Sequence, residues 1–431
     1  MADDRNAAAL YDGPRRALGF AVVGAVAGAA IAAGPLIGGW VTTELSWRYV
    51  FAGEVVIVVC ILLMRGRLRI APQTGRRPSL DLVGVAISSL GLGLVVFGIL
   101  KSSEWGLIQP RGALTIGGEE ITPFGFSSVP FFIVAGVACL AGFAVWEDRR
   151  ERLGRDTLLD RTILRAPLLR AGLSTLLMQQ LVLLGLFFVM PVYLQVVLGL
   201  NAFETGKKLF PLSVAMFLAA IAGPKLAAGS APKRVCQVGL VALAFASILL
   251  LATIDVELND AGFAISMIVF GIGAGLLLSQ LGNVIMSSVP PDRINEAGGL
   301  QGTAQNLGAS LGTALIGAVL IAALTNGFLE RVQTNPAVPP AVQQQVADVA
   351  QAGLEVVPVD DVEQAALDQG VPEEQAQAIA HDYGEAQLQG LKRAVGAVAL
   401  FALMGLWFTR HLPGRTAPEP ARAREPAVVA G

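Results

Sequence analysis

The feature that most constrains this chain is a series of long apolar runs. About 20 consecutive apolar residues are needed for a helix to cross the roughly 30 Å hydrocarbon core of a membrane. Ten runs reach this length, at 17–41, 48–64, 80–100, 128–146, 171–198, 207–229, 235–254, 262–289, 298–325 and 391–409. The sequence therefore predicts an all-α integral membrane protein with ten transmembrane helices.

Composition excludes several other classes of protein. The chain is 54% hydrophobic and 15% charged, whereas soluble domains carry about 25% charged residues. A net charge of −2 gives no reason to expect a nucleic-acid partner. The two histidines and three cysteines lack the spacing of a metal or catalytic cluster. We therefore expect no catalytic residues, no metal, no cofactor and no enzymatic activity.

Arginines in the short loops predict the orientation. One cluster lies within 65–77, after the second predicted span, and another within 149–170, after the fourth. Loops rich in Lys and Arg stay in the cytoplasm, and two spans separate these clusters, so they agree. Ten spans then place both termini in the cytoplasm, and we expect a multi-pass protein of the plasma (inner) membrane.

One polar insertion, 326–390, separates the last two spans. It contains eleven Asp or Glu residues against the single Arg331, and valines at helical spacing. We expect an extracellular helical hairpin that is either a lid or cation-attracting vestibule, or a solvated insertion without a role of its own. The Pro-, Ala- and Arg-rich tail 413–431 is predicted to be a disordered cytoplasmic tail.

Two of the spans share a glycine repeat. The spacing Gly-x3-Gly-x5-Gly-x3-Gly occurs twice, 274 residues apart, at Gly24, Gly28, Gly34, Gly38 and at Gly298, Gly302, Gly308, Gly312. Each set falls within an arc of about 120° on its helix, and such stripes let helix backbones approach closely in lipid. If the two helices are equivalent members of two halves, four spans of its own half precede the second helix, whereas none precedes the first. We therefore expect a symmetric parent of fourteen spans, of which four are absent here.

The first glycine helix also carries a recognisable motif. Gly34-Pro35-Leu36-Ile37-Gly38-Gly39, followed by Trp47-Arg48-Tyr49-Val50-Phe51, resembles the antiporter motif of exporters in the major facilitator superfamily. The chain is most similar to their fourteen-helix drug:proton antiporters, lacking the first four helices. It departs from that pattern at Glu54 and Val56, where Asn and Pro are common, and at Ala228, where an acidic residue is usual.

The resemblance implies a domain organisation. Residues 1–70 would be a two-span remnant of the N-terminal helix bundle, and 71–165 a linker helix pair. Residues 166–412 would form the C-terminal six-helix bundle, which contains the insertion 326–390.

The resemblance also implies an activity, namely secondary active transport. It would be proton-coupled export of small amphipathic compounds by alternating access, with the bilayer, the small molecule and protons as partners. A second interpretation stays open, in which the chain is a truncated non-transporting protein or a fragment that needs a separate N-terminal half. The sequence predicts neither the substrate nor the oligomeric state.

Ionisable residues within a span are candidate site residues, because placing them in lipid costs free energy. Glu54 is the candidate proton site, because an ionisable side chain at the centre of a span costs about 2.5–3.5 kcal/mol. Its alternative is a carboxylate at the headgroup boundary, paired with Arg48 or solvated. Pro35 removes a helix hydrogen bond beside Gly34, Gly38 and Gly39, so this motif is interpreted as a seal or pivot, with Gly34 and Gly38 as its most sensitive positions.

Neutral polar residues of the second half form the candidate substrate pathway. They are Gln179, Gln180, Tyr193, Gln195, Gln280, Asn283, Gln301, Gln305 and Asn306. Individually, each side chain could instead form an interhelical hydrogen bond that contributes about 0.6 kcal/mol. As a group, they favour the lining of a polar cavity.

Overall fold

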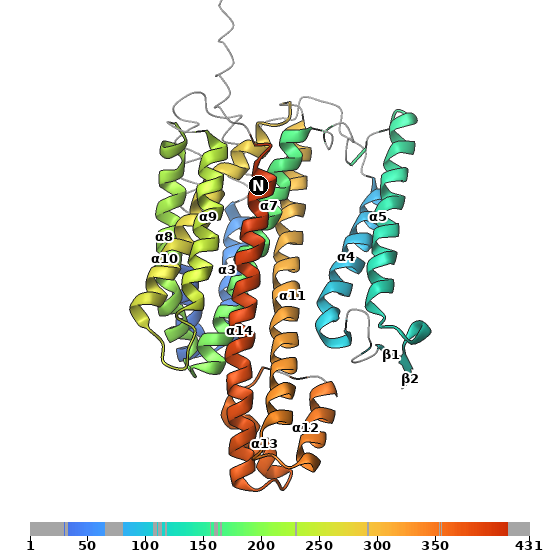
Figure 1. Ribbon diagram of the computed structural model, residues 1–431. Coiled ribbons are helices and arrows are strands. Elements are labelled where there is room, and N and C mark those ends of the chain that lie inside the picture. The colour runs from blue at the N-terminus through green and yellow to red at the C-terminus, as the bar shows by residue number, and fades with distance from the viewer. Residues whose placement is uncertain are drawn as a thin grey trace, which may run out of the picture.

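The structure is a computed structural model, shown in Figure 1, and it is almost entirely helical. It describes residues 33–64, 81–106, 114–116, 119–155, 166–228, 231–290, 293–352 and 356–412, with single positions between these ranges. Among the described residues, nine helices are long and apolar enough to cross a membrane. They match nine of the ten predicted spans. Most of the remaining one, 17–41, and the tail 413–431 lie outside the described residues.

The described elements follow one another along the chain as nine candidate spans with shorter elements between them. The candidate spans are α3 (Trp47–Met64), α4 (Leu82–Trp105), α5 (Val129–Arg152), α7 (Pro167–Pro191) with its continuation η4 (Val192–Val197), α8 (Ala202–Ala228), α9 (Pro232–Leu251), α10 (Asp260–Met286), α11 (Ile294–Thr334) and α14 (Glu373–Thr409). The other elements are η1 (Val41–Leu45), β1 (Leu114–Ile116), β2 (Glu119–Ile121), η3 (Pro123–Gly125), α12 (Pro340–Ala352) and α13 (Val359–Asp368). The strands form one antiparallel hairpin.

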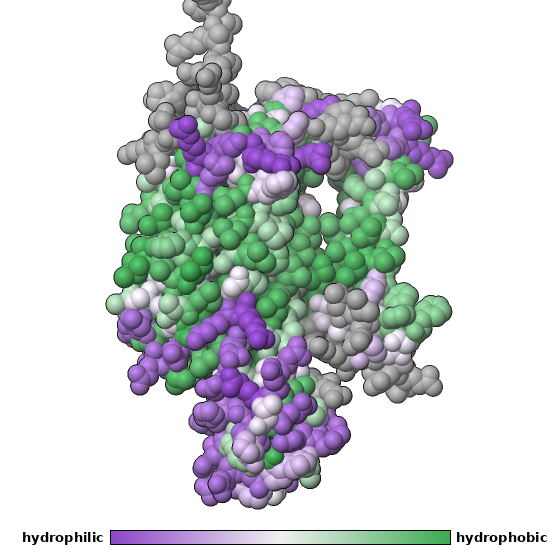
Figure 2. Space-filling view, viewed as in Figure 1, coloured by the Kyte–Doolittle hydropathy of each residue, from purple (hydrophilic) through white to green (hydrophobic). Residues whose placement is uncertain are grey.

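Helices α7 to α11 and α14 form one bundle around a continuous apolar core. Helix α10 packs against α8 and α9, while α7 packs against α11 and α14. Tyr193, Phe263 and Phe270 are among its largest fully buried side chains. Figure 2 shows an apolar band across the helices, with polar residues above and below it. This band is the surface expected of a protein whose middle is solvated by lipid.

Glycines set the closest contacts within this bundle. A Cβ atom at Gly308 of α11 would lie 2.5 Å from the carbonyl oxygen of Leu177 on α7, and one at Gly312 would meet the carbonyl oxygen of Leu181. Gly302, on the same predicted stripe, has no atom within 4 Å of its Cβ position. Part of the stripe is therefore a helix contact. Similar contacts join α8, α9 and α10 at Gly239, Gly271, Gly273 and Gly275.

The insertion forms a small helical domain with its own core. Helices α11 and α14 continue beyond the apolar band, where α12 contacts α11 and α13 contacts α14 (Figure 1). Phe328 and Tyr383 meet edge to face at 5.4 Å between ring centroids. The Tyr383 hydroxyl accepts from the Val357 amide at 3.1 Å, and Gln387 Nε2 donates to the Val357 carbonyl at 2.9 Å. The domain is helical, as expected, but it contains two helices more than a simple hairpin.

Helices α4 and α5 form a separate pair that contacts the bundle through α11. Asp81 caps α4 by accepting from Gly84 N at 3.0 Å, and it also accepts from Trp146 Nε1 at 2.9 Å and from Arg150 at 3.3 Å. Burial raises the pKa of the Asp81 carboxyl, but these donors and a hydrogen bond with Glu147 outweigh it and lower the pKa. Asp81 thus joins the start of α4 to the arginine-rich end of α5.

Glycines that touch a neighbouring backbone and glycines that face open space predict opposite changes in stability when a methyl group is added. We expect Gly312→Ala to lower the stability of the bundle by about 1–3 kcal/mol, since the added carbon meets backbone that cannot move away. Gly302→Ala, on the same helix, should be neutral or stabilising by up to about 1 kcal/mol. Thermal unfolding in detergent followed by size-exclusion chromatography measures both. Equal unfolding temperatures for the two variants would contradict this packing.

Candidate functional site

The Gly-Pro motif lies on a helical segment, 33–40, that packs against the first turns of α8. A Cβ atom at Gly39 would lie 2.5 Å from the carbonyl oxygen of Ala202, and one at Gly206 would meet the carbonyl oxygen of Pro35. The Phe203 amide donates to Thr43 Oγ1 at 3.1 Å. Two segments about 160 residues apart in the chain therefore touch backbone to backbone, with no side chain between them.

Only part of the predicted motif makes this contact. Gly39 is buried, whereas Gly34 and Gly38 have no atom within 4 Å of their Cβ positions. The close contact is thus made by Gly39 and its partner Gly206, and not by Gly34 or Gly38. Sequence reasoning missed Gly206, because a single glycine at the start of an amphipathic span carries no spacing signal. Gly24 and Gly28 lie outside the described residues.

Glu54 is not enclosed by any residue that the structure describes. It is the eighth of the 18 residues of α3 and is exposed, as are nearly all its neighbours on that helix. It stands near the middle of this helix. The Arg48 guanidinium lies 4.9 Å from the centre of the Trp47 ring and is not paired with Glu54 in the described structure.

Three of the candidate pathway glutamines come from three neighbouring helices. Gln179 of α7 is buried, and its Nε2 donates to the Ala274 carbonyl of α10 at 3.5 Å. Gln280 of α10 is buried and donates to Ser279 Oγ at 3.1 Å. Gln301 of α11 lies beside α10, with its Nε2 4.0 Å from the Cβ position of Gly282.

Two of these side chains keep an unsatisfied oxygen. Gln179 Oε1 and Gln301 Oε1 are buried and have no hydrogen-bond partner among the described residues. A buried acceptor without a partner costs about 1–3 kcal/mol. A water molecule or a polar group of a ligand would remove this cost. The arrangement can therefore accept hydrogen bonds from a small molecule inside an otherwise apolar bundle.

Tyr193 has a different environment from the glutamines. Its hydroxyl donates to the Asp255 carbonyl at 2.7 Å and accepts from the Asp255 amide at 3.1 Å. The side chain is fully buried at the end of the bundle opposite the α5 arginines. Helix α7 ends at Pro191, and one π-helical stretch, η4, carries Tyr193 to this position. It anchors η4 to the connection between α9 and α10.

The remaining candidates are spread over the bundle. Gln180 is half-buried beside Gly308, with its Cβ 3.0 Å from that glycine's Cβ position. Asn306 is exposed and donates to the Gly302 carbonyl of its own helix at 2.9 Å. Gln305 is half-buried, and Gln195 and Asn283 are exposed. The structure therefore does not bring all nine residues into one cavity. Among the described residues, no group of His, Cys, Asp or Glu is placed to hold a metal ion.

The sequence matches one family model and several curated transport and resistance proteins. The family model described as "Major Facilitator Superfamily" matches residues 5–313. The tetracenomycin C resistance and export protein of Streptomyces glaucescens is 27% identical over 413 residues, which is 94% of this chain and 70% of that protein. The probable actinorhodin transporter of Streptomyces coelicolor is 26% identical over 317 residues, 72% of this chain and 51% of that protein.

A third similar protein is also named as a resistance protein. The puromycin resistance protein of Streptomyces alboniger is 28% identical over 334 residues, which is 75% of this chain and 60% of that protein. The chain thus spans between about half and 70% of the length of these three curated relatives.

The Tyr193 contacts predict a purely structural role for this residue. Tyr193→Phe leaves the N–H and carbonyl groups of Asp255 without their partner, so we expect a loss of about 1–3 kcal/mol of stability. Ligand affinity should not change. Tyr49→Phe, at an exposed position of α3, is the matched control. Thermal unfolding and a ligand-binding isotherm separate the two effects, and a weaker ligand affinity at unchanged stability would show that Tyr193 lines the pathway.

Proposed function

This chain belongs to the major facilitator superfamily, and on that premise we propose that it exports small amphipathic compounds across the plasma membrane by alternating access. The names of its relatives, which include resistance and export proteins, support this class of substrate. Coupling of export to an inward flow of protons is part of the proposal.

The observation that carries the proposal is the backbone contact between 33–40 and α8. In alternating access, one helix bundle rocks against another around a site near the bilayer midplane. Two backbones without intervening side chains can form a seal that opens and closes as a unit. Small residues at such a contact favour close packing by dispersion forces. We assign this contact the role of the seal or pivot on which the two bundles move.

The three glutamines provide the polar part of the substrate pathway in this proposal. Gln179 and Gln301 each offer a buried acceptor, and Gln280 adds a buried amide on α10, whose Nε2 lies 3.7 Å from the Cβ position of Gly223 on α8. The other candidates, Gln180, Gln195, Asn283, Gln305 and Asn306, are assigned to the rim of this pathway. Their neutral side chains suit compounds that differ in charge, since no fixed ion pair is required.

The orientation and organisation of the chain form a further part of the proposal. The arginines of 149–152 lie at one end of the apolar band and the acidic domain of 326–390 at the other (Figures 1 and 2). The positive-inside rule then favours a cytoplasmic arginine end with both termini on that side. We propose 1–70 as part of a first bundle, 71–165 as a linker pair and 166–412 as a second bundle.

Helix α3 favours a second candidate role. Every residue of α3 is exposed or half-exposed, and among the described elements its main contact is with η1. A helix that is apolar all round is expected to be covered by protein or by lipid. In this alternative, the chain does not transport on its own and needs a further helical bundle that covers α3. Efflux of a fluorescent cation from vesicles that contain this chain alone would reject it.

The seal predicts that two adjacent glycines respond differently to the same side chain. Gly39→Leu places four carbons against the backbone of α8, so we expect efflux to fall at least about tenfold. Gly38→Leu points into open space and should retain efflux. Dye efflux from vesicles with a pH gradient measures both, with surface expression as control. Equal efflux by both variants would overturn the role assigned to this contact.

The proposed proton site can be tested separately. A charge near the centre of a span costs about 2.5–3.5 kcal/mol, and proton binding to Glu54 removes that cost. We expect Glu54→Gln to abolish the stimulation of efflux by a pH gradient while downhill exchange of substrate persists. Glu44→Gln, at an exposed position of η1, is the control. Full stimulation in the Glu54 variant would place the proton site elsewhere.

A further inference from the structure

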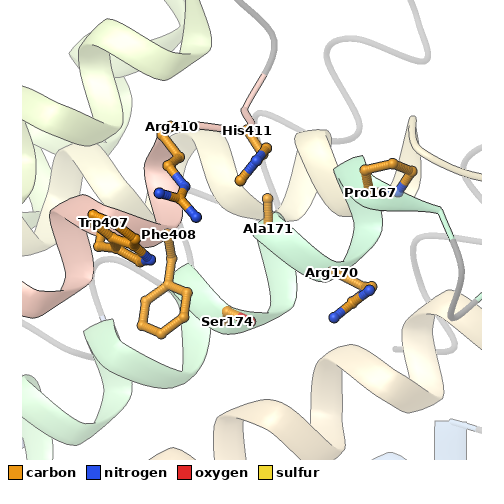
Figure 3. A pocket seen from close by; sticks show the side chains of 8 residues that line it. All are labelled: Pro167, Arg170, Ala171, Ser174, Trp407, Phe408, Arg410 and His411. Atoms are coloured by element: carbon orange, nitrogen blue, oxygen red, sulfur yellow. The ribbon is translucent and has the colours of Figure 1, made fainter.

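A basic cavity lies at the arginine end of the bundle, between the first turns of α7 and the end of α14. Its volume is about 280 Å³. Figure 3 shows the side chains that surround it, which include Arg170, Ser174, Trp407, Phe408, Arg410 and His411. None of these residues belongs to the proposed substrate pathway or to the seal. The cavity combines positive charge, a hydroxyl group and aromatic rings at one edge of the apolar band.

Arg410 is held in place at this cavity by an aromatic ring and not by a carboxylate of the described residues. The Arg410 guanidinium lies 3.7 Å from the centre of the Trp407 ring, a cation–π contact that fixes its position. Lys233 Nζ donates to the Arg410 carbonyl at 2.7 Å and holds the end of α14 against α9. Among the residues that the structure describes, no carboxylate pairs with the side chain of Arg170 or Arg410. The site therefore has a fixed positive charge and room for an anion.

An apolar stripe leads from the membrane interior to this cavity. Leu400, Leu403, Met404 and Trp407 lie on one face of α14 at helical spacing, and their exposed fractions are 58%, 48%, 46% and 64%. The stripe ends one helical turn or less before Arg410. An exposed Trp beside cations is typical of the boundary between acyl chains and headgroups. A free anion from water would make no use of this stripe.

From these observations we propose that the cavity binds the phosphate of an anionic phospholipid, whose acyl chain lies along the stripe of α14. Arg170 and Arg410 contact the phosphate from two helices, and Ser174 and His411 supply further donors. Guanidinium groups suit this role because they offer paired N–H donors to phosphate oxygens. Basic pockets between transmembrane helices are known to bind lipid headgroups. The bound lipid would join the cytoplasmic ends of α7 and α14.

The test is native mass spectrometry of the full chain in detergent, after delipidation and addition of phosphatidylglycerol or phosphatidylcholine. We expect a retained phosphatidylglycerol adduct on the wild type and little phosphatidylcholine. Arg170→Gln combined with Arg410→Gln should reduce phosphatidylglycerol binding at least about tenfold, since each arginine near a lipid phosphate contributes. Arg152 is an exposed arginine in the last turn of α5 and does not line the cavity, so Arg152→Gln should leave phosphatidylglycerol binding unchanged.

A second variant separates occupancy of the cavity from loss of charge. Ser174→Phe fills the cavity and keeps both arginines, so it should also weaken phosphatidylglycerol binding. Equal binding by wild type and by both cavity variants would overturn the proposal. Displacement of the lipid by millimolar inorganic phosphate, with equal retention of both lipids, would show a free-phosphate site and overturn the lipid assignment. The readout is lipid binding, so neither result depends on whether the chain exports anything.

Discussion

The structure depends on contacts between helix backbones at glycine. In lipid, apolar side chains gain little by leaving one apolar environment for another, so packing and dispersion decide which helices associate. Gly308 and Gly312 bring α11 onto α7, and Gly271 and Gly275 bring α10 onto α8. The contact between Gly39 and α8 is of the same kind. It joins the motif segment to the bundle with only backbone on both sides.

The polar groups are distributed in a way that complements this packing. Polar residues border the apolar band on both sides, with the arginines at the end of α5 on one side and the acidic first turns of α13 and α14 on the other. Inside the band, glutamines leave acceptors without partners, and a ligand or water can use them. At the cationic edge, Arg170 and Arg410 face a cavity instead of a carboxylate. The interior thus suits small molecules, while the edge suits lipid.

Much of the helical fold could be predicted from the sequence. The contacts that could not be predicted depend on groups that leave no pattern in the sequence. Apolar runs located nine spans, because hydropathy reports the solvent that a helix requires. They located the apolar part of α14 at 391–409 but not its start at Glu373, because the first turns of this helix are polar on the outside and pack on the small domain. Glycine spacing found Gly308 and Gly312, but it could not show that Gly39 and Gly206 meet. The hydrogen bonds between Tyr193 and the backbone of Asp255 could not be predicted either, because a backbone partner leaves no sequence pattern.

The central claim is that the contact between the motif segment and α8 moves during export. It is tested most directly by a thiol cross-link between Thr43→Cys and Phe203→Cys, in a chain without Cys60, Cys139 and Cys236. The account predicts that a short cross-linker joins these positions in native membranes, that the joined protein no longer exports, and that a reductant restores export. A cross-linked protein that exports at the full rate would contradict the account, as would the absence of any cross-link.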